Sequence, residues 1–313
     1  MAKNFIVLDT ETAPMVKHFD GKAHPETSLV YDLGWVVVDG NTLEIISQTS
    51  FVIADTYCNP ALMNSAYYAK KLPQYNAGAA FCPTAAEWHI KSFLEAWQIF
   101  CNQITFYNVK KVWAWNVQFD NAALDHTISH YSNGFITSFL PQGVTYGDVW
   151  DYVTSRLCST KKYVKWCRNN GFTTAKGNPK TSAEIVYRYL TSQPDFIERH
   201  TANSDATIEA EMLIKAKKAH KKGANTIGQG WRYPKNLVNA VQNDEIKKQV
   251  KQQEKLEKKM KQEIIKNVQE YLSSVSSDYA RQIDRRFTDY KSRKYLYGEQ
   301  WADEWLYLVW DYA

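Results

Sequence analysis

Residues 5–11 read Phe-Ile-Val-Leu-Asp-Thr-Glu, four apolar residues followed by two carboxylates separated by one threonine. An uninterrupted apolar run is typical of a strand buried on both faces of a sheet. Side chains two positions apart on a strand point to the same side, with Cα atoms about 6.7 Å apart. Asp9 and Glu11 are therefore expected to converge on one pair of ions at the end of this strand, where ligands of α/β sheets usually bind.

The segments that follow predict a mixed sheet covered by helices. Residues 33–38 and 45–53 are apolar enough for two further strands, and Asp39-Gly40-Asn41 between them has the composition of a hairpin turn. Apolar spacing predicts helices over 85–100, 182–190 and 204–222, a strand over 109–115, a helix capped by Asn116, and a short strand leading into a helix over 145–153. Residues 161–180 are expected to form a basic connection. The predicted fold class is α/β.

Composition excludes several classes of protein. The 313 residues are 44% hydrophobic and 23% charged, and no stretch approaches the ~18 uncharged apolar residues that span a bilayer. The N-terminal segment meets Asp9 after four apolar residues, so a secretory signal and membrane association are not expected. Five cysteines without a C-x-x-C spacing argue against a disulfide framework or a cysteine-rich zinc site. We therefore expect a cytoplasmic protein.

Charge divides the chain into two parts. Residues 1–207 carry 17 Lys+Arg and 18 Asp+Glu, whereas residues 208–313 carry 21 and 15. Apolar residues then recur every three or four positions over 246–279 among many lysines, which predicts a long amphipathic helix, followed by an aromatic-rich end. We expect a catalytic domain over 1–222 and a basic, aromatic-rich helical extension over 223–313. The lysine-rich face is a solvated surface, a nucleic-acid contact or a partner helix.

Two more motifs accompany the first carboxylates. Asn116-Val117-Gln118-Phe119-Asp120 opens a predicted helix after a strand, and His200 precedes Asp205 by five positions at the start of another helix. Each acid alone is more often a helix-end charge or a surface group, and a lone loop histidine is usually structural. All three motifs together are expected in only about 1–2% of chains of this composition. The combination therefore points to a shared site.

In this combination the sequence resembles the DEDDh exonucleases, the DnaQ-like proofreading family with a ribonuclease H-like fold. Their D-x-E motif matches Asp9 and Glu11, their N-x-x-F-D motif matches the string ending at Asp120, and their H-x4-D motif matches His200 and Asp205. The resemblance covers roughly residues 1–222. The basic loop before 182–190 and the C-terminal extension look similar to phage-encoded members, which would place the protein in a bacterial host cytoplasm.

The resemblance implies a role for each matched residue. Asp9, Glu11, Asp120 and Asp205 would hold two Mg²⁺ or Mn²⁺ ions, and His200 would accept a proton from the attacking water. Backbone groups around Thr10–Thr12 would hold the terminal nucleotide, with Asn116 also in contact with substrate. Independently, four acids in one cleft repel each other unless cations neutralise them, and oxygen ligands suit Mg²⁺ or Mn²⁺ better than Zn²⁺.

The predicted function is a 3′→5′ exonuclease that releases nucleoside 5′-monophosphates from single-stranded DNA or, less favoured, RNA. The alternative is a nucleic-acid-binding or docking subunit that contacts a replication or repair partner through residues 223–313. Two glycine-containing stretches carry no known phosphate motif: residues 177–182 (GNPKTS) lack the G-x-x-x-x-G-K-[ST] pattern, and residues 228–230 (GQG) are too short for a dinucleotide fingerprint.

Overall fold

The computed structural model describes residues 3–16, 20, 23–64, 90–219, 224–274 and 277–297, to which every structural statement below refers. Contacts group the chain into two compact units, Met1–Val241 and Gln242–Ala313. The predicted α/β fold class is confirmed: a mixed sheet flanked by helices, with a helical C-terminal region.

Six strands of the described residues form one sheet in the order β4-β3-β2-β1-β5-β6. Their bounds are β1 Phe5–Pro14, β2 Ser28–Val38, β3 Ile45–Ile53, β4 Ile90–Lys91, β5 Lys111–Ala114 and β6 Thr145–Asp148. β2 pairs antiparallel with β1 and with β3. β5 pairs parallel with β1, and β6 pairs parallel with β5. Every residue of β2 is buried, as expected for a central strand.

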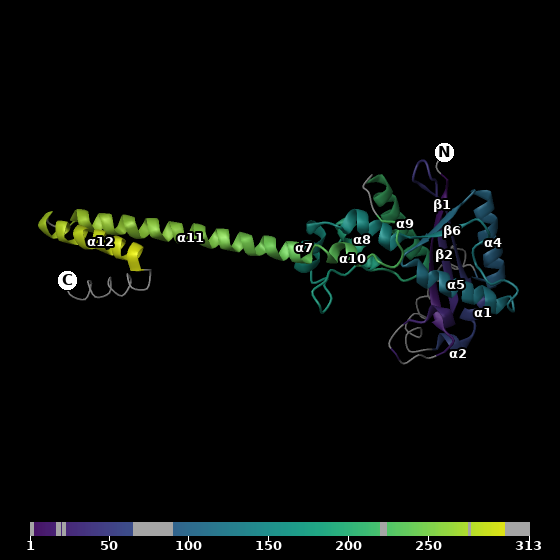
Figure 1. The fold of residues 1–313 in the computed structure, drawn as a ribbon. Coiled ribbons are helices and arrows are strands. Elements are labelled where there is room, and N and C mark those ends of the chain that lie inside the picture. Colours follow the sequence, from purple (N-terminus) through teal and green to yellow (C-terminus); the bar gives the residue numbers. More distant parts are fainter. Residues whose placement is uncertain are drawn as a thin grey trace. The chain divides into compact units, whose positions relative to one another are not determined.

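Helices cover both faces of this sheet (Figure 1). In chain order the first unit contains η1 Pro25–Thr27, α1 Ala54–Tyr57, α2 Pro60–Met63, α4 Phe93–Phe106, α5 Val117–Tyr131, α6 Val149–Val153, η4 Thr154–Cys158, α7 Lys161–Asn169, α8 Ala183–Thr191, α9 Ala202–Lys218 and α10 Arg232–Lys235. Ile6 and Leu8 of β1 pack with α4 and α5, whereas Phe5 and Val7 pack with α6 to α9. This double packing explains why the strand is apolar without alternation.

The structure corrects several predicted boundaries. The helix expected over 85–100 begins at Phe93 and extends to Phe106, because Ser92 and Glu95 form a capping box; residues 85–89 lie outside the described part of the chain. The segment 161–180 is not only a connection, since α7 occupies its first half and buries Tyr163, Val164 and Cys167.

The first strand is also longer than predicted. β1 does not end at Leu8 but continues to Pro14, paired throughout with β2, and its register shifts between Glu11 and Thr12. Its pairing with β5 stops at Val7, so the carboxylates lie beyond the parallel part of the sheet. Asp9 and Glu11 are therefore held inside a strand rather than at its end.

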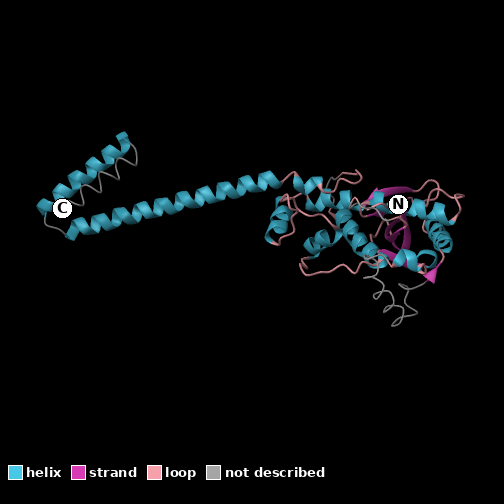
Figure 2. Cartoon of the chain, turned by 90° about the horizontal axis from the view of Figure 1, so that it is seen from below, coloured by secondary structure: helices cyan, strands magenta, loops and turns pink. Residues whose placement is uncertain are grey.

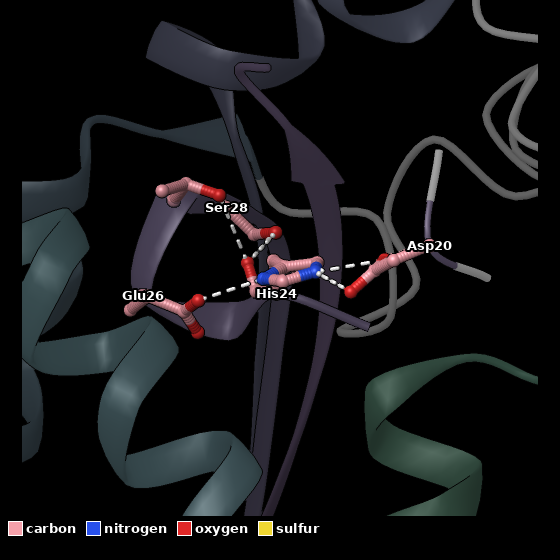
Figure 3. Close-up of polar contacts among 5 residues, drawn as sticks. Asp20, His24, Glu26 and Ser28 are labelled. Carbon is pink, nitrogen blue, oxygen red and sulfur yellow. Dashed lines mark hydrogen bonds and ion pairs between the residues drawn. The ribbon is translucent and has the colours of Figure 1, made fainter. Parts of the chain in front are cut away.

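A histidine between two carboxylates lies in the connection from β1 to β2. Figure 3 shows the ring of His24 between the carboxylates of Asp20 and Glu26, with N–O distances of 3.0 and 2.8 Å. The hydroxyl of Ser28, the first residue of β2, donates to the His24 carbonyl at 2.8 Å. The hydrogen bonds to Glu26 and then Asp20 raise the pKa of His24. The sequence indicated no partner for this histidine.

The second unit is helical in its described residues (Figure 2). α11 Val238–Ser274 begins four residues before this unit, and α12 Ser277–Tyr297 follows α11 within it. The long helix predicted over 246–279 is therefore divided between two helices. Ile246, Val250, Leu256 and Met260 of α11 are exposed. None of the described helices combines the length and apolarity required to span a membrane. The aromatic residues beyond 297 lie outside the described part.

Candidate active site

Side chains from all three sequence motifs surround Asp9. Asp9 and Glu11 come from β1, Asp120 from the first turn of α5, and Asp205 from the first turn of α9. The carboxylates whose charges act on Asp9 are, in order of strength, Glu209, Asp205, Asp120 and Glu11. The structure therefore brings the four predicted acids together and adds a fifth.

His200 lies at the exposed side of the same cluster. Its Nδ1 is 3.9 Å from Asp205 Oδ2 and 3.8 Å from Glu198 Oε2, and its side chain is 54% exposed. One ligand atom each of Glu11, His200 and Asp205 lie within 4.8 Å of one another. Carboxylate oxygens such as those of Glu11 and Asp205 are the ligands that Mg²⁺ and Mn²⁺ prefer, whereas an imidazole nitrogen is more typical of Zn²⁺. Glu11 and Asp205, both predicted to hold a divalent ion, are thus close enough to share one, with the predicted proton acceptor His200 beside them.

Asp120 is oriented by Thr10, which was predicted from the sequence to bind substrate. The Thr10 hydroxyl donates to Asp120 Oδ1 at 2.7 Å, and the Thr10 side chain is buried, as is that of Thr12. Asn116 lies at the N-cap of α5 as predicted, but its side chain makes no capping hydrogen bond. Its backbone is left-handed, with φ 55°, a conformation that asparagine tolerates better than most residues. The predicted cap is therefore a backbone turn.

Sequence reasoning missed Glu209, which lies one helical turn after Asp205 on α9. It is 2% exposed and accepts a hydrogen bond from the backbone N–H of Trp115 at 3.1 Å. It therefore links α9 to the end of β5, directly before the turn at Asn116. The signal was present, since an acid four residues after Asp205 shares its helix face.

Two residues of β2 place the N-terminus of α9 beside Asp9. Asp32 is 2% exposed and accepts a hydrogen bond from the Ala202 N–H at 3.0 Å, which satisfies one N–H group at the start of the helix. Gly34 is paired with Asp9 across the strands, and a Cβ there would overlap the backbone of Ala202 and Asn203. The missing side chain lets α9 lie directly on β2.

We expect Gly34→Ala to destabilise the protein by about 1–3 kcal/mol, because the added methyl group meets backbone rather than a movable side chain. The shift of α9 should also weaken Mn²⁺ binding by the carboxylates, since Asp205 moves with that helix. Urea unfolding and the Mn²⁺-dependent thermal shift measure the two effects. Wild-type stability of Gly34→Ala would contradict this packing.

Burial raises the pKa values of the central carboxyls. For Asp9 the pKa lies well above its usual range because of burial, and the neighbouring carboxylates add to the shift. Burial also raises the pKa of Asp120 to about 7, although the hydrogen bond from Thr10 acts in the opposite direction. The pKa of Glu209 is raised by burial, with Asp120 the strongest neighbouring charge. Without cations, this cluster favours bound protons.

The thermal midpoint of the metal-free protein should fall as the pH rises from about 5 to about 7.5. In this range the folded carboxyls retain protons that the unfolded chain has lost above its ordinary pKa of about 4, so the free energy of unfolding decreases with pH. Mn²⁺ should raise the midpoint at pH 7.5, and by less at pH 5, where protons compete. Scanning fluorimetry with EDTA or Mn²⁺ measures both shifts.

The control for this pH effect is Asp9→Asn, because carboxyls elsewhere, such as Asp148 with a pKa raised by burial to about 6, contribute a slope of the same sign. The variant should show a smaller fall between pH 5 and 7.5. A midpoint in EDTA that is constant or rises over this range would contradict the clustered carboxyls.

Comparison with known proteins gives structural matches only. No family model and no curated protein matches this sequence. Among solved structures, the chain is similar to the nuclease domain of 3'hExo, a DEDDh family member bound to rAMP, with 8% identity and a TM-score of 0.46 over 72% of this chain and 96% of that chain. Cell-death related nuclease 4 (CRN-4) is 12% identical with a TM-score of 0.45, and the match covers 70% of this chain and 65% of that chain. E. coli exonuclease I in complex with an oligonucleotide is 17% identical with a TM-score of 0.40, and the match covers 70% of this chain and 41% of that chain.

Proposed function

We propose that this chain is a divalent-metal-dependent 3′→5′ exonuclease of the DEDDh type, which removes nucleoside 5′-monophosphates from single-stranded nucleic acid, with DNA favoured over RNA. One observation carries the proposal. The three motifs, up to 196 positions apart from Asp9 to Asp205, bring four carboxylates and a histidine into one cluster. A purely structural role does not account for so many mutually repelling buried acids.

Each residue has a role that follows from its place. Asp9, Glu11, Asp120 and Asp205 would together hold two divalent ions. Bound Mg²⁺ or Mn²⁺ would supply Lewis-acid stabilisation of the attacking and leaving oxygens. His200, partly exposed beside Asp205, would accept the proton of the attacking water, and the nearby carboxylates stabilise the resulting imidazolium.

The direct test incubates the full chain and Mn²⁺ with single-stranded DNA and RNA of equal sequence, each labelled at the 5′ end. Products that shorten progressively from the 3′ end, absent with EDTA, would establish the activity, and the faster ladder would identify the preferred sugar. Release of the label as a mononucleotide would reverse the proposed polarity. Intact oligonucleotides of both kinds would refute the nuclease.

A second candidate is docking to a nucleic-acid-bound partner through the extension. The supporting observation is the set of exposed apolar side chains on α11, which include Val250, Leu256 and Met260. Substituting these three by serine in the full chain should abolish partner capture and leave cleavage unchanged. Unchanged capture would exclude this surface.

A further inference from the structure

The carboxylate cluster is a poor source of affinity for a nucleic-acid strand. It contributes negative charge, whereas phosphate contacts from lysine and arginine provide most of the binding free energy of such strands. A chain that shortens single strands therefore needs cationic surface beyond its reacting centre.

Two segments of the first unit provide such charge. Residues 152–183 contain seven Lys+Arg and no Asp or Glu, and residues 212–241 likewise contain seven Lys+Arg and no Asp or Glu. The segments lie 28 residues apart in the sequence, yet they meet in the fold, because α10 of the second packs on α7 of the first. Their contact concentrates positive charge on one part of the unit.

A pocket of about 360 Å³ lies between these segments. One wall is formed by Thr174 and residues 178–182, which contain Lys180, and the other by Trp231 and Lys235. None of these lining residues is acidic. Trp231 is 42% exposed, and Lys235 Nζ lies 4.8 Å from the centre of its ring. An exposed tryptophan beside lysines is the combination that stacks a base and contacts the adjoining phosphate.

Hydrogen bonds hold the first wall in place. The segment folds back on itself, since the Lys180 N–H donates to the Phe172 carbonyl at 2.9 Å and the Thr174 N–H donates to the Asn178 carbonyl at 2.8 Å. The Tyr163 hydroxyl of α7 donates to the Lys180 carbonyl at 2.7 Å. The GNPKTS segment, which lacks a P-loop pattern, therefore presents Lys180 from a fixed backbone.

The second wall is held by hydrogen bonds to the end of β6 and to α6, and this wall lies near α5. Gly228 N–H donates to Asp148 at 2.9 Å and Gln229 N–H donates to Asp151 at 2.7 Å. A Cβ at Gly228 would lie 2.8 Å from the side-chain oxygen of Gln118, two positions before Asp120. The chain reach from Gly228 to Trp231 then places the pocket no more than roughly 25 Å from Asp120. A strand of several nucleotides can bridge this distance.

We propose that this pocket is a second binding site for the single strand whose 3′ end occupies the carboxylate cluster, with a base stacked on Trp231 and phosphates at Lys180 and Lys235. The inference rests on the proposed function for the direction of the strand. The binding of nucleic acid by the pocket is independent of cleavage.

The test measures fluorescence anisotropy of the full chain in EDTA, which prevents hydrolysis, with labelled oligonucleotides of 2 and about 12 nucleotides. Trp231→Ala should weaken binding of the longer strand by about 5- to 150-fold, the range for loss of one stacked base. Trp231→Phe should retain most of the affinity. Lys180→Gln with Lys235→Gln should reduce the slope of log affinity against log salt by about 1.4, the value for two phosphate contacts to a single strand.

Phe135→Ala is the matched aromatic control, because Phe135 is 90% exposed and does not line the pocket, and Lys110→Gln is the lysine control. Wild-type affinity and salt slope in both pocket variants would overturn the proposal, as would an equal loss of affinity in the two control variants. A chain that binds the longer strand through this pocket but leaves it intact with Mn²⁺ refutes the nuclease alone. A chain that shortens the strand while both pocket variants bind normally refutes the pocket alone.

Discussion

Replacement of Asp9 by asparagine should reduce turnover of a single-stranded oligonucleotide by about 10³-fold or more. Four carboxylates (Glu209, Asp205, Asp120 and Glu11) act on Asp9, and removal of its charge should weaken the binding of ions that would stabilise the transition state. The same change should raise the thermal midpoint of the metal-free protein at pH 7.5, because it removes a buried carboxyl that must either carry an unfavourable charge or bind a proton that the unfolded chain releases. Gel-resolved cleavage with Mn²⁺ and scanning fluorimetry with EDTA measure the two effects.

The opposite directions of these two effects distinguish a functional acid from a structural one. A carboxylate that stabilised the fold through an ion pair would lower the midpoint when it was replaced. Asp195→Asn provides the control, since Asp195 is an exposed acid in the loop that leads to His200 and has no place in the cluster. Cleavage by Asp9→Asn at the wild-type rate would remove Asp9 from the site and with it the proposed mechanism.

The central features of the fold could be predicted because they are local. A strand buried on both faces needs an uninterrupted apolar run, and residues 5–8 and 33–38 both have one; β3 matches its predicted bounds of 45–53. α7 was missed because its lysines and the glycines after it suggested a loop, although Tyr163, Val164 and Cys167 already form the apolar face of a short helix.

The supporting residues of the site could not be predicted, because they depend on contacts between distant segments. Asp32 accepts its hydrogen bond from a residue 170 positions away, and only the packing of α9 on β2 gives it that partner. Nothing in the sequence around Gly34 indicates that a helix backbone lies against it, and only the structure shows this close approach. Motif matching finds residues that contact the reacting atoms, whereas residues that hold two elements together carry no motif.

The turn at His200 shows how the two kinds of information combine. The motif identifies the imidazole, and the structure adds that its backbone is left-handed, with φ 56°. Asparagine tolerates this conformation as histidine does, whereas alanine is strained there. His200→Asn therefore removes the imidazole without disturbing the turn that carries it.

We expect His200→Asn to slow the chemical step by about 10²- to 10⁴-fold, the usual contribution of a general base. Binding of Mn²⁺ and of the oligonucleotide should remain within a few fold of wild type, because the carboxylates and the basic pocket are intact. Single-turnover cleavage measures the step, and the Mn²⁺-dependent thermal shift measures the metal. Imidazole in the buffer should restore part of the rate, since His200 is 54% exposed and its loss leaves the water accessible to a small base.

His130→Asn is the matched control, since His130 lies on α5 outside the cluster and its loss should alter none of these quantities. The pH–rate profile separates proton transfer from metal binding. The wild-type rate should fall as acid protonates the base, and His200→Asn should lose that part of the profile while cleaving slowly at every pH. A variant whose main defect is loss of the Mn²⁺ shift would instead make His200 a metal ligand, as its place within 4.8 Å of Glu11 and Asp205 allows. The water would then need another base, and Glu198, 3.8 Å from His200, is the nearest carboxylate outside the motifs.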